Sequence, residues 1–270
     1  MKGRPARGLA TLVLLLGGCV AGRVPDPTAA WPPLPAADAG PLLAALAARE
    51  QAVQGARGLV RVTATAFGVR RRFTQVLVLQ RPDRFRIEVL AFGATPVLLA
   101  ASDGRAMQIH ALDRREFLEG PSVAGALEEL AGFPVEPAIL VRLFLGLPPL
   151  PAPPGAVVRA IPGGTQQAVA WEGPQGRMIL TLAGEPARPI AGSLTVDERG
   201  ELSFAFGNYG EVDGMAWPGW IIVRRPADGI EVEVRYDTVE VNPPTAAGTF
   251  RLDPPDDPGT VRRPLNGPRR

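Results

Sequence analysis

Chemically reactive side chains are scarce in this chain of 270 residues. Cys19 is the only cysteine and His110 is the only histidine. A single cysteine excludes an internal disulfide and a cysteine-based metal site, and a single histidine excludes a histidine-rich one. The stability of the folded chain must therefore come from its apolar core.

The sequence also lacks a group of residues that would support catalysis. His110 lies at the end of a predicted strand, where a structural or surface role is more common than that of a lone catalytic base. The carboxylates lie mostly on the polar faces of predicted strands, and Gly163-Gly164 lacks the lysine and the strand-to-helix setting of a phosphate loop. We predict that the chain is not an enzyme, and we expect no cofactor and no metal ion.

The apolar run from Leu9 to Leu16 is too short to cross a membrane, which takes about 20 apolar residues. It follows Lys2, Arg4 and Arg7, and a Pro-rich stretch comes after it. A basic start, a short apolar run and then small residues are typical of a signal peptide rather than of a membrane span.

The last four residues of this segment, Leu16-Gly17-Gly18-Cys19, resemble a bacterial lipobox. The small residues before Cys19 allow the narrow, extended backbone that a peptidase needs just before its cleavage point. The alternative is an ordinary secretory signal in which Cys19 falls near the cut by chance. We predict that residues 1–18 are removed and that Cys19 carries lipid, which would anchor the chain to a membrane.

The charge balance argues against nucleic acid as a partner. The 29 basic and 27 acidic residues include three basic residues of the predicted signal peptide, so the chain from Cys19 onward has 26 against 27. Its net charge is therefore near −1. No arginine cluster interleaves with aromatic residues as a nucleic-acid groove requires, and the pairs Arg262-Arg263 and Arg269-Arg270 lie in a Pro-rich tail.

Composition divides the chain into four segments. Residues 1–18 form the signal peptide, and residues 19–38 form the lipidated cysteine with a Pro- and Ala-rich, semi-rigid tether. Residues 39–254 form one folded domain, of a size that all-β folds commonly reach. Residues 255–270 form a Pro/Arg-rich tail that we expect to be disordered.

Alternating apolar and charged residues predict a mainly β fold. Phe85, Ile87 and Val89 alternate with charged residues, and the same period of two recurs between Ile230 and Tyr236. Short strands separated by tight turns imply an antiparallel meander. The eleven predicted strands are residues 57–67, 70–80, 84–90, 96–102, 105–110, 166–172, 176–183, 190–196, 201–207, 218–224 and 230–237.

Three helices are predicted beside these strands. The first begins at Pro41 and ends near Gly55, and the other two span residues 122–131 and 136–146. The last helix is apolar almost all round, so it must be covered on most sides. A sheet of about eleven strands curls as it twists. The predicted fold is therefore a curved antiparallel sheet, or half-open barrel, with a helical lid across a space that is either filled or hollow.

Several short motifs in this chain follow an order that occurs in a known family. After the lipobox and the first helix come the strand 84–90, the turn Ala91-Phe92-Gly93-Ala94-Thr95 and the strand 97–100. Residues 131–135 then lead into a helix that ends in Leu143-Phe144-Leu145-Gly146-Leu147-Pro148.

Two further motifs complete the pattern. They are Trp217-Pro218-Gly219-Trp220-Ile221 before a strand, and Val239-Glu240-Val241-Asn242 before Phe250. In this order of motifs, most of residues 40–252 resembles the LolB family of outer-membrane lipoprotein receptors, within the wider LolA/LolB-like superfamily. The tether and the tail are not part of the family's pattern.

The resemblance implies a receptor that takes acylated lipoproteins from a LolA-like periplasmic carrier and helps to insert them in the outer membrane. The chain would be a monomer, lipid-anchored to that membrane, with its domain facing the periplasm. Acyl chains would rest in an apolar cavity, for which the candidate residues are Ile139, Leu140, Leu143 and Phe144. A turn in the family projects an apolar side chain into lipid, and Leu90 and Phe92 occupy the matching turn here.

Two interpretations of the domain remain open. A lipid-handling receptor predicts a continuous dry cavity under the helix 136–146 and an exposed Phe92. An anchored scaffold or sensor, which binds a protein or an envelope component with the same fold, predicts a filled core and a polar mouth. Phe92 could equally fold back onto the sheet. Val20, rather than an aspartate, follows Cys19, and this favours the outer membrane as the destination.

Overall fold

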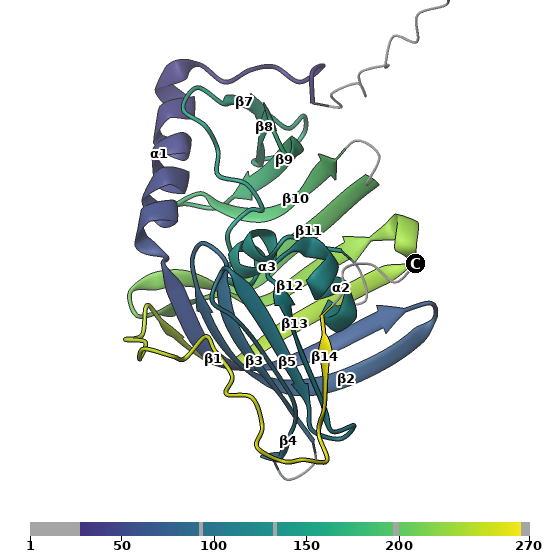
Figure 1. Cartoon of the computed structure of the whole chain (residues 1–270). Coiled ribbons are helices and arrows are strands. Elements are labelled where there is room, and N and C mark those ends of the chain that lie inside the picture. The colour runs from purple at the N-terminus through teal and green to yellow at the C-terminus, as the bar shows by residue number, and fades with distance from the viewer. Residues whose placement is uncertain (1–27, 92–93, 132–133, 197–199, 266–270) are drawn as a thin grey trace, which may run out of the picture.

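One curved sheet of fourteen strands forms the β part of the computed structural model, which describes residues 28–91, 94–131, 134–196 and 200–265 (Figure 1). The strand order is β14-β6-β5-β4-β3-β2-β1-β13-β12-β11-β10-β9-β8-β7. Neighbouring strands are antiparallel, except for β14, which runs parallel to β6. Two meanders, β1 to β6 and β7 to β13, therefore meet where β1 pairs with β13.

The strands lie within the following bounds. They are β1 Gly55–Ala66, β2 Val69–Gln80, β3 Arg84–Leu90, β4 Pro96–Ser102, β5 Ala106–Ala111, β6 Glu116–Pro121, β7 Val157–Ala160, β8 Gln167–Gly173, β9 Gly176–Ala183, β10 Arg188–Val196, β11 Gly200–Val212, β12 Met215–Arg225, β13 Ile230–Val241 and β14 Val261–Pro264. The helices are α1 Ala36–Ala52, α2 Ala124–Ala131 and α3 Pro137–Phe144, and a 3-10 turn, η3, spans Pro226–Asp228.

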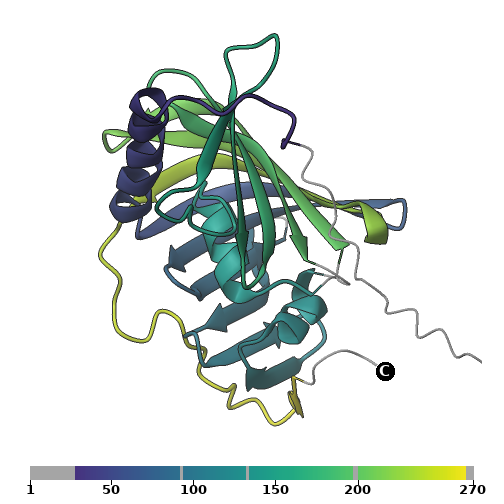
Figure 2. The same cartoon turned by 90° about the horizontal axis from the view of Figure 1, so that it is seen from above.

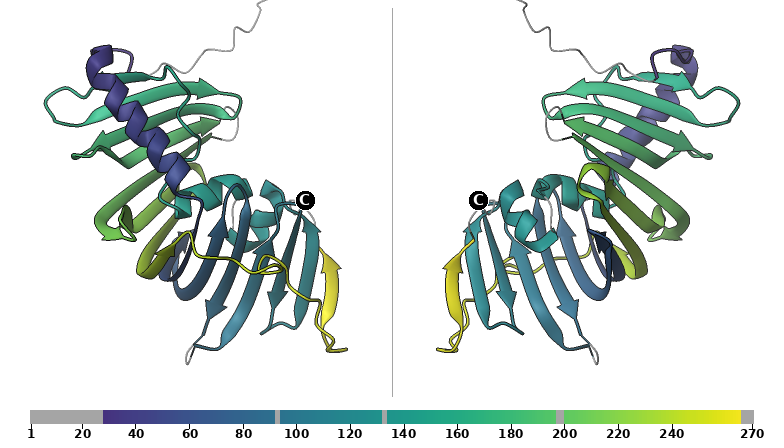
Figure 3. Two further views of the ribbon diagram at one scale, coloured as in Figure 1. Left: turned by 90° about the vertical axis from the view of Figure 1, so that its left-hand side faces the viewer. Right: turned by 90° about the vertical axis from the view of Figure 1, so that its right-hand side faces the viewer.

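The helices lie on the concave face of the sheet. Seen from above, the two halves of the sheet curl around α3 (Figure 2). The side views show α1 running across the strands of the β7–β13 half and α2 and α3 lying against the β1–β6 half (Figure 3). The helices pack against this face because it carries the apolar side chains. Strand residues alternate between the two faces, so Val60, Val62 and Val234 lie on the concave face, whereas Arg61 and Arg235 lie on the outer face. None of the described helices is long and apolar enough to cross a membrane.

The core under α1 is filled by large side chains. Met178, Leu180 and Leu182 of β9 have no exposed surface, and Leu145 and Leu147 after α3 are at most 1% exposed. These residues belong to one apolar cluster that extends through the β1–β6 half as well. The part of the β7–β13 half that lies under α1 is therefore a packed core.

The predicted architecture is confirmed in its main features: the fold is mainly β, with one open, curved sheet and few helices. All eleven predicted strands occur, but the number eleven is wrong, because β6, β7 and β14 also pair. These three have four to six residues and lack a clear apolar alternation; β14 contains a single apolar residue before its arginines. Their pairing is decided by the neighbouring strand rather than by their own pattern.

Both predicted ends of the folded domain were placed too far inward. Helix α1 begins at Ala36, directly after Pro35, so that Pro41 lies inside the helix and not at its start. Pro33 forms a bridge with Arg159 of β7, so part of the predicted tether lies on the sheet.

The tail that we expected to be disordered is ordered as far as Leu265. Its strand β14 pairs with the free edge of β6, and Leu265 is 3% exposed against Gly120. An unpaired sheet edge presents a row of free N–H and C=O groups, and the tail satisfies these groups. The prediction of disorder was therefore wrong for residues 255–265.

Candidate functional site

An apolar cavity of about 130 Å³ lies between α3 and the central strands of the sheet. Strands from both halves contribute to its wall, and Gln75 is the only polar residue among those that line it. The lining residues are Val62, Ala64, Phe73, Gln75, Ile87, Val135, Leu140, Leu143, Phe144, Val223 and Val232. Such a wall offers little hydrogen bonding and favours apolar groups.

The structure brings three of the four residues predicted for the acyl-chain cavity to this place. Leu140, Leu143 and Phe144 line the cavity, whereas Ile139 is buried in the surrounding core without lining it. Leu90 ends β3 and lies on the outer face of the sheet, where it lines a separate groove. Phe92 and Cys19 lie outside the described residues.

Glycine ends α3 as its position in the sequence predicts. Gly146 has a φ of +65°, and the backbone N–H groups of Gly146 and Leu147 donate to the carbonyls of Leu143 and Arg142 over 2.9 Å each. This is the pattern of a Schellman C-cap, which needs a left-handed residue. A Cβ at position 146 would come within 2.8 Å of the Pro218 ring, so glycine also permits the close approach of β12.

Two buried polar side chains hold the same end of α3 against the sheet. The Tyr236 hydroxyl of β13 donates a hydrogen bond to the carbonyl of Phe144, and burial raises the pKa of Tyr236. The Arg49 guanidinium of α1 donates to the carbonyl of Ala216 at 2.6 Å and to that of Gly146 at 3.3 Å. Burial lowers the pKa of Arg49. The C-terminal end of α3 is thus attached to α1, β12 and β13.

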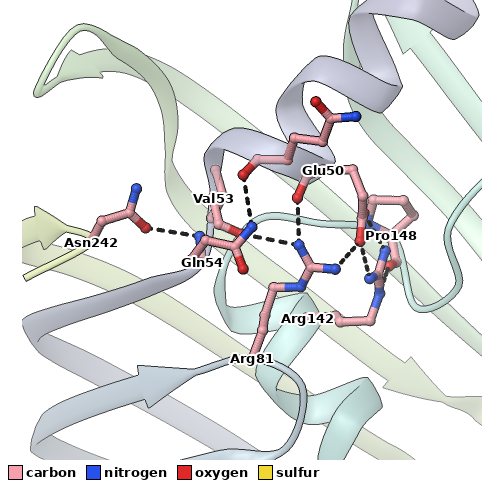
Figure 4. Close-up of polar contacts among 8 residues, drawn as sticks. Glu50, Val53, Gln54, Arg81, Arg142, Pro148 and Asn242 are labelled. Atoms are coloured by element: carbon pink, nitrogen blue, oxygen red, sulfur yellow. Dashed lines mark hydrogen bonds and ion pairs between the residues drawn. The ribbon is translucent and has the colours of Figure 1, made fainter.

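A charged network fastens the last turn of α3 to α1 (Figure 4). Arg142, 7% exposed, donates to both carboxylate oxygens of Glu50 at 2.6 and 2.8 Å, and to the carbonyl of Pro148 at 2.8 Å. Arg81, in the turn between β2 and β3, also pairs with Glu50 and donates to the carbonyl of Val53. Bidentate contacts of this kind between arginine and carboxylate are stronger than ion pairs with a single hydrogen bond.

Asn242, after β13, completes the network at the end of α1. Its side-chain oxygen accepts from the backbone N–H groups of Gln54 and Gly55 at 2.8 and 3.0 Å, and its amide donates to the carbonyl of Ala52 at 2.7 Å. The end of α1, the last turn of α3, the β2–β3 turn and the end of β13 are therefore joined by polar contacts.

The ionisation of Glu50 reflects this setting. Burial, the largest single influence, favours the neutral acid, but the hydrogen bond from Arg142 and the charges of Arg142 and Arg81 together outweigh it. The pKa of Glu50 therefore lies below its ordinary value of 4.5.

Stability is expected to depend on pH through Glu50. Because its pKa is lower in the folded chain than in the unfolded chain, its contribution is complete above the unfolded value and is lost as the pH falls through the folded value. We expect Glu50→Gln to be less stable than the wild type at neutral pH, and this difference to shrink from about pH 5 to about pH 3. Urea unfolding of both chains across this range tests the prediction, and a difference that does not change with pH would contradict it.

Sequence analysis did not identify Glu50, Arg81 or Arg142 as members of a site. The available signal was Arg142 itself, a lone charge in the apolar helix Ile139-Leu140-Val141-Arg142-Leu143-Phe144. A buried charge requires a partner, but the partner is 92 residues away in the sequence. His110 lies on β5 with its ring 5.8 Å from that of Phe117, remote from this network in the sheet order.

No protein-family model and no curated protein sequence matches this chain. A LolA superfamily protein from Nitrosomonas europaea aligns with a TM-score of 0.54 at 9% sequence identity, over 78% of this chain and 97% of the other. The chain has a LolA/LolB-like fold. A domain from Vibrio parahaemolyticus assigned to outer-membrane lipoprotein sorting aligns with a TM-score of 0.50 at 8% identity, over 77% of this chain and 94% of the other.

The LolA/LolB-like fold agrees with the resemblance that the sequence motifs indicate, at the level of the superfamily. At such low identities the likeness concerns the fold alone. In this chain the concave face of the LolA-like sheet carries α3, the apolar cavity and the Glu50 network together.

Proposed function

We propose that this chain is a membrane-anchored lipoprotein receptor. It accepts the acyl chains of lipoproteins in the apolar cavity beside α3 and helps to insert these lipoproteins in the outer membrane. A lipid on Cys19 would hold it at that membrane with its domain facing the periplasm, and a periplasmic carrier with a LolA-like fold would supply the cargo. The observation that carries the proposal is the apolar wall that α3 and the sheet form together inside a LolA-like fold.

The cavity must widen to hold a lipoprotein anchor. At about 130 Å³ it has room for about four water molecules, whereas ligand pockets usually measure about 300 to 1,000 Å³. The region under α1 is filled by its own side chains, so added space has to come from an outward shift of α3. In this proposal α2 and α3 act as a lid, and the Glu50–Arg142 pair holds the lid to α1.

The chemistry of the wall suits acyl chains better than a polar ligand. Leu140, Leu143 and Phe144 face the apolar side chains of β1, β3 and β12, with Gln75 as the one polar contact. Each methylene group that leaves water for such a wall contributes about 0.8 kcal/mol. A single acyl chain anchors weakly in a membrane, so the cargo would carry more than one, and the receptor would gain from each.

Photo-crosslinking tests capture directly. The full chain with Cys19→Ser, which cannot be lipidated, is incubated with an acylated lipoprotein that carries photoreactive groups in its acyl chains. We expect adducts on Leu140, Leu143 or Phe144 of α3 and on the facing residues of β1 and β3. The same lipoprotein with its lipid removed is the control, and it should give no adducts at these positions.

Delivery is tested separately from capture. A Phe92→Glu variant should still form adducts but should transfer less lipoprotein to liposomes, because an acidic side chain would not enter lipid. A folded chain that forms no adducts would overturn the proposal and would favour an anchored scaffold or sensor that binds a protein or an envelope component.

A further inference from the structure

The hairpin of β1 and β2 extends beyond the neighbouring strand β3, whereas β13 accompanies β1 as far as Thr65. Its last cross-strand pair is Ala66 with Val69, while the neighbouring strand β3 pairs only as far as Thr74. The hairpin therefore passes the end of β3 by about five residues, or roughly 17 Å at the rise of a strand. Figures 1 and 2 show its tip projecting to one side, beside the β12–β13 turn.

The tip exposes apolar side chains at the point where the chain turns. Phe67 is 84% exposed and Val69 is 56% exposed, and both belong to the few large apolar residues that face solvent among the described residues. Phe67 and Gly68 both have positive φ values, +50° and +78°, as in a two-residue hairpin turn. Glycine or asparagine is usual at both places, so an aromatic residue with a left-handed backbone is uncommon there.

Three arginines follow the tip without acidic partners. Arg70, Arg71 and Arg72 are exposed, and none of them takes part in an ion pair or a side-chain hydrogen bond within the described residues. Because strand residues alternate, Arg70 and Arg72 lie on the outer face of the hairpin and Arg71 lies on the inner face. Both faces of the tip therefore carry positive charge.

The neighbouring arginines differ in this respect. Arg61 pairs with Asp237 at 2.7 Å, Arg235 pairs with Glu233, and Arg224 pairs with Glu231 at 2.6 Å. The acids beside the hairpin are thus already neutralised, and the excess charge is confined to β2. Arg70 and Arg72 line an outer groove of about 790 Å³ together with Arg61, Leu90 and Ala91.

The inner face of the hairpin leads to the apolar cavity. Phe73 and Gln75 of β2 line the cavity, and Arg71 precedes them on the same face, directly across from the cavity residue Ala64. An acyl chain that left the cavity along β2 would pass Phe73 and then reach Arg71 and Val69 at the tip.

We infer that the β1–β2 hairpin is a docking element for a bilayer that contains anionic phospholipid. Phe67 and Val69 enter the interface between headgroups and acyl chains, and Arg70, Arg71 and Arg72 bind lipid phosphates. An exposed aromatic residue beside unpaired cations fits such a bilayer, because its interface takes up apolar side chains and its anionic headgroups attract the arginines. The inference goes beyond the proposed function, since it assigns the membrane contact to a segment other than the turn of Leu90 and Phe92.

Vesicle binding tests this inference without any lipoprotein. The full chain with Cys19→Ser is sedimented with vesicles of phosphatidylcholine alone or with phosphatidylglycerol added, at several salt concentrations. We expect stronger binding to the anionic vesicles, which weakens as salt shortens the range of the attraction. Changing Arg70, Arg71 and Arg72 to serine should reduce this binding about a hundredfold, at about fivefold for each arginine. Phe67→Ser should reduce it by about tenfold or more.

A matched control removes the same charge from the other end of the sheet. Arg57 of β1, Arg84 of β3 and Arg105, in the turn before β5, are exposed at the other end of the sheet, and their triple change to serine should leave vesicle binding unchanged. Changing Arg70, Arg71 and Arg72 to lysine keeps the charge and should retain binding. Two results would overturn the inference. One is an equal loss of vesicle binding in the two triple-serine variants, and the other is binding of a DNA oligonucleotide in place of anionic vesicles. A failure of lipoprotein capture would leave it intact.

Discussion

Replacing Arg142 with alanine is expected to lower the free energy of unfolding by about 3 to 5 kcal/mol, the usual cost of removing one partner from a buried ion pair. Arg142 donates to both oxygens of Glu50 and to the carbonyl of Pro148. Its loss leaves the Pro148 carbonyl without this donor and leaves Glu50 with Arg81 as its remaining partner in a largely buried place. Urea unfolding followed by tryptophan fluorescence measures the change.

An exposed ion pair with the same separation provides the control. Arg224 and Glu231 are 2.6 Å apart, as are Arg142 and Glu50, but their side chains are 45% and 46% exposed. We expect Arg224→Ala to cost about 1 kcal/mol or less, because solvent screens an exposed pair. Similar losses in the two variants would show that burial does not strengthen the role of Arg142. Replacing Arg142 and Arg81 by methionine and Glu50 by leucine together should restore much of the stability, since no charge of this network is then left alone.

The second large effect is expected from Ala64→Phe, which places a ring in the cavity beside α3. Ala64 lines the cavity on β1 opposite Leu143 and Phe144. Because each buried methylene contributes about 0.8 kcal/mol, excluding three of them should weaken acyl-chain capture roughly fiftyfold. The yield of adducts with the photoreactive lipoprotein measures capture.

A measurement of stability shows whether the loss of capture in Ala64→Phe comes from the filled cavity or from misfolding. Because the ring enters existing space, the free energy of unfolding of Ala64→Phe should change by about 1 kcal/mol or less. Ala47→Phe adds the same ring to an exposed position of α1 and should leave both capture and stability as in the wild type. If a folded Ala64→Phe chain captured lipoprotein as well as the wild type, the acyl chains would have to bind elsewhere.

The strands of this fold could be predicted wherever one face of a strand is buried and the other is wet. Phe85, Ile87 and Val89 repeat every second residue, and so do the inward residues of β13, so these strands are evident from the sequence. Short strands at the edges have no such pattern. The partner of β14 is an edge that exists only after β6 has folded, so its pairing could not be inferred from Val261 and its neighbours.

The candidate site shows the same division. That α3 is buried follows from its apolar residues on almost every side, and its end at Gly146 follows from glycine chemistry. The size of the cavity does not, because it is the space left between side chains from strands far apart in the chain, such as Val62, Ile87 and Val223. Local patterns contain no information on how such volumes add together.

By itself the sequence determined a mainly β domain with a curved sheet, a buried helix before Gly146, and a LolA/LolB-like fold, with which the structure comparison agrees. Only the tertiary structure decided that the cavity is small, that Arg142 is paired with Glu50, and that Phe67 and three unpaired arginines project from a hairpin tip. The alternation of apolar and polar residues along a strand shows which of its faces is buried, and this information is local to the strand. Partners, enclosed volume and exposure depend on which distant segments come together, and this is settled only by folding.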